Sequence, residues 1–241
     1  AITWRIARRH RRADQSLLTI VAGGLLVAAI FARYGLLFRY LQEASTPDLD
    51  GFLRYGGRTL LGGLAGAYIG VVVTKRLIGY RRHTGDLLAP GVALGIAIGR
   101  LGCFLTERPG TPTTLPWGVH VPPDAAARYR DCEACATGAA MHPSFLYESA
   151  FLAAAGWWLL RLDTSDKRPA AWMKEGDLFK LFLAAYAVFR LLVERVRGNP
   201  VMAFGLSGSQ LMVLPAIAAL ALYFLREWRA ARFAAAAPSL T

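Results

Sequence analysis

The stretch GDLLAPGVALGIAIGRLGCFLTERPG, residues 85–110, decides how the rest of the chain is interpreted. It begins as an apolar helix that carries an arginine, Arg100, near its far end, and it then breaks into a segment rich in Gly and Pro. A cation so deep in an apolar run is costly in lipid, so it usually faces a partner or a polar cavity. An arginine near a helix end can instead extend to the membrane interface, and this stretch alone leaves both interpretations open.

The composition places this helix in a membrane protein. Of the 241 residues, 55% are hydrophobic and only 18% are charged. The apolar residues occur in blocks long enough to cross a bilayer. We therefore expect an all-α fold, a polytopic transmembrane helical bundle that forms a single domain over residues 1–241.

Six segments are apolar enough to be membrane spans. They cover about residues 16–41, 54–75, 87–105, 141–160, 178–196 and 207–225. The second span carries glycines at every fourth position, Gly62, Gly66 and Gly70, which would let another helix backbone approach closely. One long polar excursion, residues 106–141, lacks a strong helical period and predicts a small head on one side of the membrane.

The distribution of Lys and Arg predicts the orientation. The two ends of the chain and the loops 75–85 and 161–177 hold sixteen of these residues, against seven in the loops on the opposite side and their flanks. Because basic residues favour the cytoplasmic side, both termini of this chain are predicted to be cytoplasmic and the head extracytoplasmic. The predicted topology thus accounts for the net charge of +12, so this charge does not indicate nucleic-acid binding. The first residue is Ala rather than Met, which leaves open a start further upstream.

Three polar residues share one face of the fifth span. Tyr186, Arg190 and Glu194 are spaced i, i+4, i+8. Arg190 and Glu194 can pair, which lowers the cost of burying both, and a purely structural ion pair is one interpretation. The other includes Arg100, because two guanidiniums in one cavity would bind a phosphate, and the phosphate source in a bilayer is a phospholipid headgroup.

Further polar residues lie near the mouth of the bundle. Glu148 stands inside the apolar fourth span, where a carboxylate needs a partner. His142 and Tyr147 lie at the outer mouth of that span, although His142 could simply end the head. Gln210 opens the sixth span and could merely cap it, as could the neighbouring serines.

The three cysteines allow two interpretations. Cys132 and Cys135 in RDCEAC would form a disulfide in an oxidising compartment, which is the first choice. Metal binding together with His120 or His142 is the alternative, but the spacing shows no complete ligand set. Cys103 lies in the third span and is expected to be a small apolar packing residue.

Taken together, these motifs resemble the prolipoprotein diacylglyceryl transferase family over most of the chain and in the family's order. GDLLAPGVALGIAIGRLGCF is similar to the signature around the family's essential arginine, which falls on Arg100. PWGV and HPSFLYE follow, with the family's glutamate on Glu148. YAVFRLLVERVR is similar to the helix whose functional residues fall on Tyr186, Arg190 and Glu194, and SGSQ resembles the Gly-Gln opening of the last helix. The resemblance implies a seven-helix fold of which this chain lacks the first helix.

The resemblance also implies an activity. Family members transfer the diacylglyceryl group of phosphatidylglycerol to the thiol of a lipobox cysteine in a preprolipoprotein and release glycerol phosphate. This chain would then be a multi-pass enzyme of the bacterial cytoplasmic (inner) membrane that uses phosphatidylglycerol or another anionic phospholipid, a preprolipoprotein acceptor, and neither cofactor nor metal. The implied catalytic residues are Arg100, Glu148, Tyr186, Arg190 and Glu194, and the implied substrate-binding residues are Arg100, Arg190, His142, Tyr147 and Gln210.

Two positions depart from the family pattern. Leu61 stands where the family has an essential histidine, and Cys103 stands where it has an asparagine. Leucine cannot accept a proton, so Glu148 or His142 would have to replace the base. The alternative is an inactive descendant that keeps the lipid pocket and serves as a membrane subunit of a larger complex. A small-molecule transporter is disfavoured, because the chain shows no pair of repeats with matching broken helices.

Overall fold

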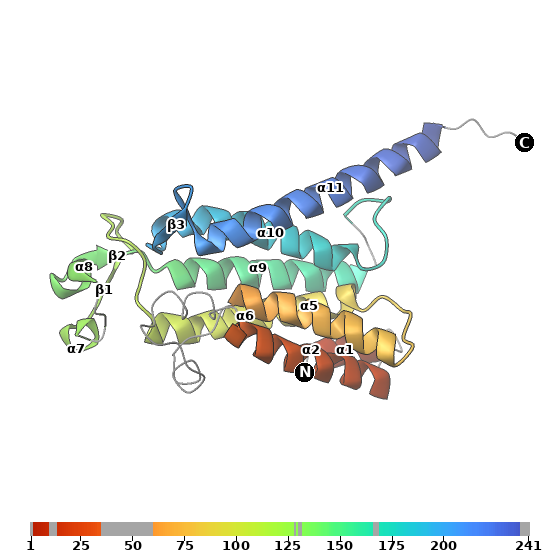
Figure 1. The fold of residues 1–241 in the computed structure, drawn as a ribbon, viewed down its shortest axis with the longest axis horizontal. Coiled ribbons are helices and arrows are strands. Elements are labelled where there is room, and N and C mark those ends of the chain that lie inside the picture. The colour runs from red at the N-terminus through yellow and green to blue at the C-terminus, as the bar shows by residue number, and fades with distance from the viewer. Residues whose placement is uncertain are drawn as a thin grey trace, which may run out of the picture. The chain divides into compact units, whose positions relative to one another are not determined.

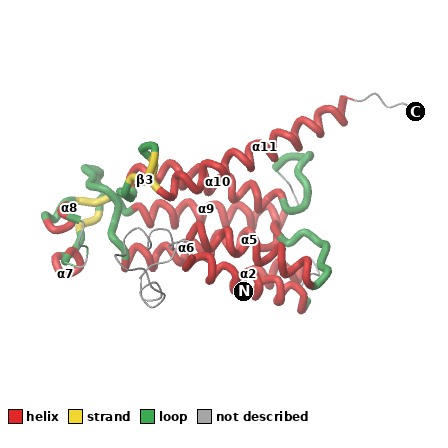
Figure 2. Tube along the Cα trace, in the orientation of Figure 1, coloured by secondary structure: helices red, strands yellow, loops and turns green. Residues whose placement is uncertain are grey.

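The computed structural model describes residues 2–9, 14–34, 60–127, 129, 132–165 and 169–236. This described chain is mostly helical, with two short pairs of antiparallel strands (Figure 1, Figure 2). Its contacts divide it into two compact units, residues 7–82 and residues 83–241 together with residues 1–6. A short helix, α1 (Ile2–Arg9), begins the chain. The single domain over residues 1–241 stays a prediction.

In the unit of residues 7–82, two helices pack closely through glycine. Helix α2 (Gln15–Tyr34) lies against α5 (Leu60–Leu77). A Cβ added at Gly66 would lie 2.5 Å from the Cβ of Phe31, and one at Gly70 would lie 2.6 Å from a backbone carbonyl oxygen of α2. Such distances leave no room for a side chain, so the predicted glycine face is confirmed as a helix-packing surface.

In the described part of the other unit, long helices build the body. They are α6 (Gly85–Thr106), α9 (Ser144–Ser165), α10 (Asp177–Val193) and α11 (Gly208–Ala236). Helix α6 packs along α9, α10 packs against both, and α11 packs against α10 (Figure 1). A Cβ added at Gly156 would lie 2.6 Å from the side chain of Leu94, which shows how closely α9 and α6 approach. Side chains on α6, α9 and α10 can therefore meet inside this unit.

One carboxylate joins the first turn of α6 to the start of α10. Asp86 accepts hydrogen bonds from the backbone N–H groups of Gly176 (2.9 Å), Leu178 (3.1 Å) and Phe179 (3.4 Å). The first N–H groups of a helix have no partner within the helix, and they carry the positive end of its dipole. Asp86 therefore caps α10 and fixes its start against α6.

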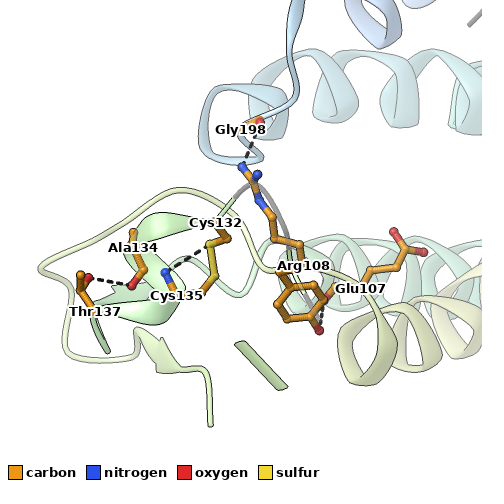
Figure 3. Close-up of a disulfide and its surroundings, with 8 residues drawn as sticks. Glu107, Arg108, Cys132, Ala134, Cys135, Thr137 and Gly198 are labelled. Carbon is orange, nitrogen blue, oxygen red and sulfur yellow. Dashed lines mark hydrogen bonds between the residues drawn. A yellow bond between two sulfur atoms is a disulfide. The ribbon is translucent and has the colours of Figure 1, made fainter. Parts of the chain in front are cut away.

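The predicted head is a small mixed structure. It contains β1 (Val119–His120), α7 (Pro123–Ala126), α8 (Glu133–Ala136) and β2 (Ala140–Met141), and the two strands pair antiparallel. Cys132 and Cys135 form a disulfide, and both are buried with Ala126 and Met141 in the head's small core (Figure 3). The first of the two interpretations of these cysteines is confirmed. The short strands were not predicted, because two-residue strands leave no alternating pattern to detect.

Membrane-compatible helices account for part of the predicted span set. Within the described residues, the helical segments Gln15–Arg33, Gly85–Thr106 and Gly208–Phe233 are long and apolar enough to cross a membrane. The end of the predicted first span and the start of the second fall in residues 35–59, which lie outside the described residues. The full set of six spans stays a prediction.

Two helix ends differ from the predicted spans. Helix α10 stops at Val193 and continues as a 3₁₀-helix, η1 (Glu194–Val196). Helix α11 runs on to Ala236, well beyond the predicted end near residue 225. Ala, Arg and Glu are strong helix formers, so this helix continues after its apolar segment has ended.

A hairpin between α10 and α11 was also not predicted. Its strands are β3 (Val201–Ala203) and β4 (Leu206–Ser207), joined through Phe204 and Gly205. Both linking residues have positive φ, 54° and 72°, which is typical of the tight turns that favour β-hairpins. Glycine adopts this conformation readily but phenylalanine does not, so the sequence carries only half of the usual turn signal.

Candidate active site

The carboxylate of Glu148 lies at the centre of a buried polar cluster. The residue is fully buried in α9. Its Oε1 accepts a hydrogen bond from the hydroxyl of Tyr186 on α10 and lies 2.7 Å from Nη2 of Arg100 on α6. Its Oε2 lies 3.1 Å from Nη1 of Arg197, which follows η1. Donors from three segments therefore fix this carboxylate and offset the cost of its burial.

A second ion pair lies one turn further along α10. Arg190 donates to Glu194 through Nη1, and both side chains are buried. Glu194 also accepts from Nδ2 of Asn199 (2.7 Å) and from Oγ of Ser207 (2.5 Å). Nη2 of Arg190 donates to Oγ of Ser209 at 3.2 Å. The predicted pair is thus confirmed, and the segment leading into α11 supplies its other partners.

Arg197 is a functional candidate that the sequence analysis missed. Besides pairing with Glu148, its guanidinium lies 4.4 Å from the ring centroid of Phe145, and that of Arg100 lies 5.7 Å from the same ring. Burial, and then repulsion from Arg190 and Arg100, lowers the pKa of Arg197. Spacing could have revealed it, because Arg197 follows Arg190 by seven residues and so continues the same helix face.

We call the three arginines Arg100, Arg190 and Arg197, with Glu148 and Glu194, the arginine cluster. Three guanidiniums against two carboxylates leave one net positive charge in a buried site. The Nε of Arg100 is buried and has no hydrogen-bond partner among the described residues. A buried donor without a partner is costly, so the cluster is suited to accept one anionic group.

His142 and Tyr147 form a separate group at the head. Nδ1 of His142 lies 3.1 Å from the hydroxyl of Tyr147, which also accepts from Nε1 of Trp117 at 2.8 Å. In the part of the chain that the structure describes, no side-chain hydrogen bond or ion pair joins His142 or Tyr147 to the arginine cluster. The head chain nevertheless anchors beside the cluster, since Thr111 N–H donates to the carbonyl of Val196 at 2.8 Å. Figure 3 shows a second anchor, from Nη2 of Arg108 to the carbonyl of Gly198 at 3.3 Å.

The remaining predicted positions have supporting or local contacts. Oε1 of Gln210 accepts from the backbone N–H of Ser207 at 2.9 Å, so Gln210 supports the serine that donates to Glu194. Cys103 is half-buried, and Nη1 of Arg100 lies 3.9 Å from its Sγ. Leu61 lies in α5, and its side chain is outside the described part of the structure.

Comparison with known proteins identifies the family of this chain. A family model described as prolipoprotein diacylglyceryl transferase matches residues 1–226. A phosphatidylglycerol–prolipoprotein diacylglyceryl transferase of Synechococcus elongatus is 32% identical over 226 residues, which cover 90% of this chain and 75% of that protein. Proteins of the same name are 33% identical in Bordetella bronchiseptica, over 85% of this chain and 72% of the relative, and 35% identical in Bacillus cereus, over 77% and 67%. This chain therefore belongs to the prolipoprotein diacylglyceryl transferase family.

Proposed function

We propose that this protein is a phosphatidylglycerol–prolipoprotein diacylglyceryl transferase. The observation that carries the proposal is the arginine cluster, in which one positive charge is left over in a buried site. The phosphodiester of phosphatidylglycerol bears one negative charge, so its entry would neutralise the cluster. The free Nε of Arg100 offers a donor for one phosphate oxygen.

In the proposed reaction, the sulfur of the acceptor cysteine attacks the glycerol carbon that bears the phosphate. A carbon–sulfur bond forms, the carbon–oxygen bond to phosphate breaks, and glycerol phosphate leaves with the bonding electron pair. Negative charge therefore grows on the phosphate oxygens in the transition state. Fixed guanidiniums in a buried site stabilise that charge at no cost of reorganisation.

The thiol proton requires an acceptor, and the described contacts distinguish the two suggested bases. Both oxygens of Glu148 already accept from Arg100, Tyr186 and Arg197. A carboxylate whose two oxygens are already held by three donors serves to position those donors, so Glu148 is assigned a positioning role. In the tautomer whose Nδ1 donates to the Tyr147 hydroxyl, Nε2 of His142 is the atom that would take the proton.

We further propose that the protein is a multi-pass protein of the bacterial inner membrane. Six spans would place both termini of this chain in the cytoplasm and the head outside. Three membrane-compatible helices and the disulfide in the head support this arrangement, because disulfides persist in oxidising compartments. The acceptor would then reach the site from the outer face, beside the head.

The proposed function is tested by measuring phosphatidylglycerol-dependent alkylation of a lipobox peptide by the full chain in phosphatidylglycerol liposomes. Arg100→Ala or Arg190→Ala should lower the rate by at least about 100-fold, because each removes a donor to developing charge. Arg226→Ala, which removes an exposed arginine on α11, should retain the parent rate. The variants Arg100→Lys and Arg190→Lys keep the positive charge but lose the planar, bidentate guanidinium. They therefore distinguish a loss of activity from a loss of folding.

The same experiment also tests the alternative function. Leu61 and Cys103 favour an inactive, lipid-binding subunit of a larger membrane complex. No transfer by the unsubstituted protein, together with lipid retained at the arginines and stable co-purification with other membrane proteins, would reject the enzyme. Turnover by the unsubstituted protein that depends on both arginines rejects the subunit.

A further inference from the structure

A cavity of about 400 Å³ lies at the end of α5, and it shares no residue with the arginine cluster. Its lining residues, which we call the basic pocket, are Val72, Lys75, Arg76, Gly79, Tyr80 and Arg81. Within the described part of the chain, none of its three cations has a carboxylate at ion-pair distance. The pocket therefore concentrates positive charge that no carboxylate of the described residues neutralises.

The backbone at the end of α5 builds this pocket. The N–H of Tyr80 donates to the carbonyl of Lys75 at 2.9 Å, and the N–H of Gly79 donates to the carbonyl of Arg76 at 3.3 Å. With Gly79 at φ +68°, these two bonds form a Schellman motif, which ends the helix and folds the chain back. Tyr80 thus returns beside the last turn, where Nζ of Lys75 lies 5.8 Å from its ring centroid.

Exposed apolar side chains neighbour the charged groups along the chain. Leu77 is 80% exposed, and Val73 and Ile78 are also exposed. A free phosphate ion would use the cations alone, whereas a phospholipid would use both the cations and this adjoining apolar surface. Basic residues placed directly at the end of a membrane helix are suited to anionic lipid headgroups.

We propose that the basic pocket binds the phosphate of an anionic phospholipid at the membrane face where α5 ends. Lys75, Arg76 and Arg81 would contact the headgroup, and the exposed apolar residues would contact the acyl chains. Because the loop that follows α5 is predicted to be cytoplasmic, this lipid would belong to the inner leaflet. The site is additional to the donor site of the proposed reaction, and its test does not depend on catalysis.

The test uses the full chain in nanodiscs of phosphatidylcholine that contain a phosphatidylglycerol carrying a photoreactive headgroup. After irradiation, mass spectrometry should locate the crosslink in the peptide that spans residues 72–81. Lys75→Gln/Arg76→Gln/Arg81→Gln should lower this crosslink by at least about fivefold, the effect of even one cation near a membrane surface. The matched control Arg226→Gln/Arg229→Gln/Arg232→Gln removes as many charges from α11 and should leave it unchanged.

Two further measurements define the site. Gly79→Ala keeps every charge but forces a side chain into positive φ, so it should also weaken the crosslink if the folded-back geometry matters. Millimolar inorganic phosphate should leave the crosslink intact. Equal loss in both triple variants, equal labelling by a phosphatidylcholine probe, or displacement by inorganic phosphate would each overturn the proposal, the last by showing a soluble phosphate site.

Discussion

The arginine cluster and the basic pocket each contain three cations, but the two groups differ in burial and in their partners. In the cluster the guanidiniums are largely buried and share two carboxylates. Tyr186 and Ser207 donate further hydrogen bonds to these carboxylates, and Arg190 donates one to Ser209. In the pocket the cations stand at an open surface without a carboxylate among the described residues. Burial makes an unpaired charge expensive, whereas water and salt screen an exposed one. The contrast predicts how strongly each group depends on its partners.

The largest effect is expected where a buried partner is removed. Glu148→Ala leaves Arg100 and Arg197 facing each other without their shared carboxylate, which should destabilise the fold by about 3–5 kcal/mol. Thermal unfolding of the purified protein in mild detergent measures this change. Glu227→Ala is the control, because Glu227 pairs at 2.5 Å with the well-exposed Lys174 and its loss should leave the unfolding temperature unchanged. Similar shifts in the two variants would contradict the role given to burial.

A smaller effect is expected from a hydroxyl at the edge of the cluster. Ser207→Ala removes one short hydrogen bond to the buried Glu194 and should cost about 1–2 kcal/mol, measured by the same unfolding experiment. Ser209→Ala is a matched variant, since its hydroxyl accepts a longer bond of 3.2 Å from Arg190. Ser207→Ala should therefore lower the free energy of unfolding more than Ser209→Ala does. The reverse order would show that the arginine, rather than the carboxylate, is the residue that needs support.

The smallest effect is expected in the basic pocket. Lys75→Gln/Arg76→Gln/Arg81→Gln should change the free energy of unfolding by no more than about 0.5 kcal/mol, because none of the three cations has a carboxylate partner among the described residues. Unfolding in detergent free of anionic lipid isolates this intrinsic effect. A large loss of stability there would mean that the three cations have structural partners, and the contrast with the arginine cluster would fail.

Much of the cluster could be predicted from the sequence because its residues interrupt apolar runs. The i, i+4, i+8 spacing predicts that Tyr186, Arg190 and Glu194 share one helix face. Glu148 is recognisable because it is a carboxylate in an apolar helix. Arg197 was missed because it follows the apolar segment and therefore resembled an ordinary loop arginine. The turn of η1 carries it back onto the same face. Hydropathy marks where an apolar segment ends, but the helical turn can continue beyond that point and place a later residue on the same face.

Other features depend on long-range contacts that one sequence does not encode in a local pattern. The glycines of α5 predicted close packing correctly, but they could not identify α2 as the partner. The pair of cysteines in RDCEAC predicted the disulfide, whereas β1 pairs with β2 between residues some twenty positions apart and leaves no local pattern to detect. The positive φ of Phe204 is set by the surrounding hairpin against the preference of the residue.

The Asp86 cap gives the candidate active site a mechanical property. Asp86 pins the start of α10, and from this point α6 extends about 21 Å to Arg100 while α10 extends about 20 Å to Arg190, at 1.5 Å per residue. The two helices therefore share one fixed point, the Asp86 cap, and the distances from this point to the two arginines are nearly equal. A tilt of only about 3° at the cap would separate the guanidiniums by about 1 Å, a misplacement that can cost an enzyme a large part of its rate. Precision at the phosphate would then be set at the opposite end of the helix pair, by a carboxylate that never touches the substrate.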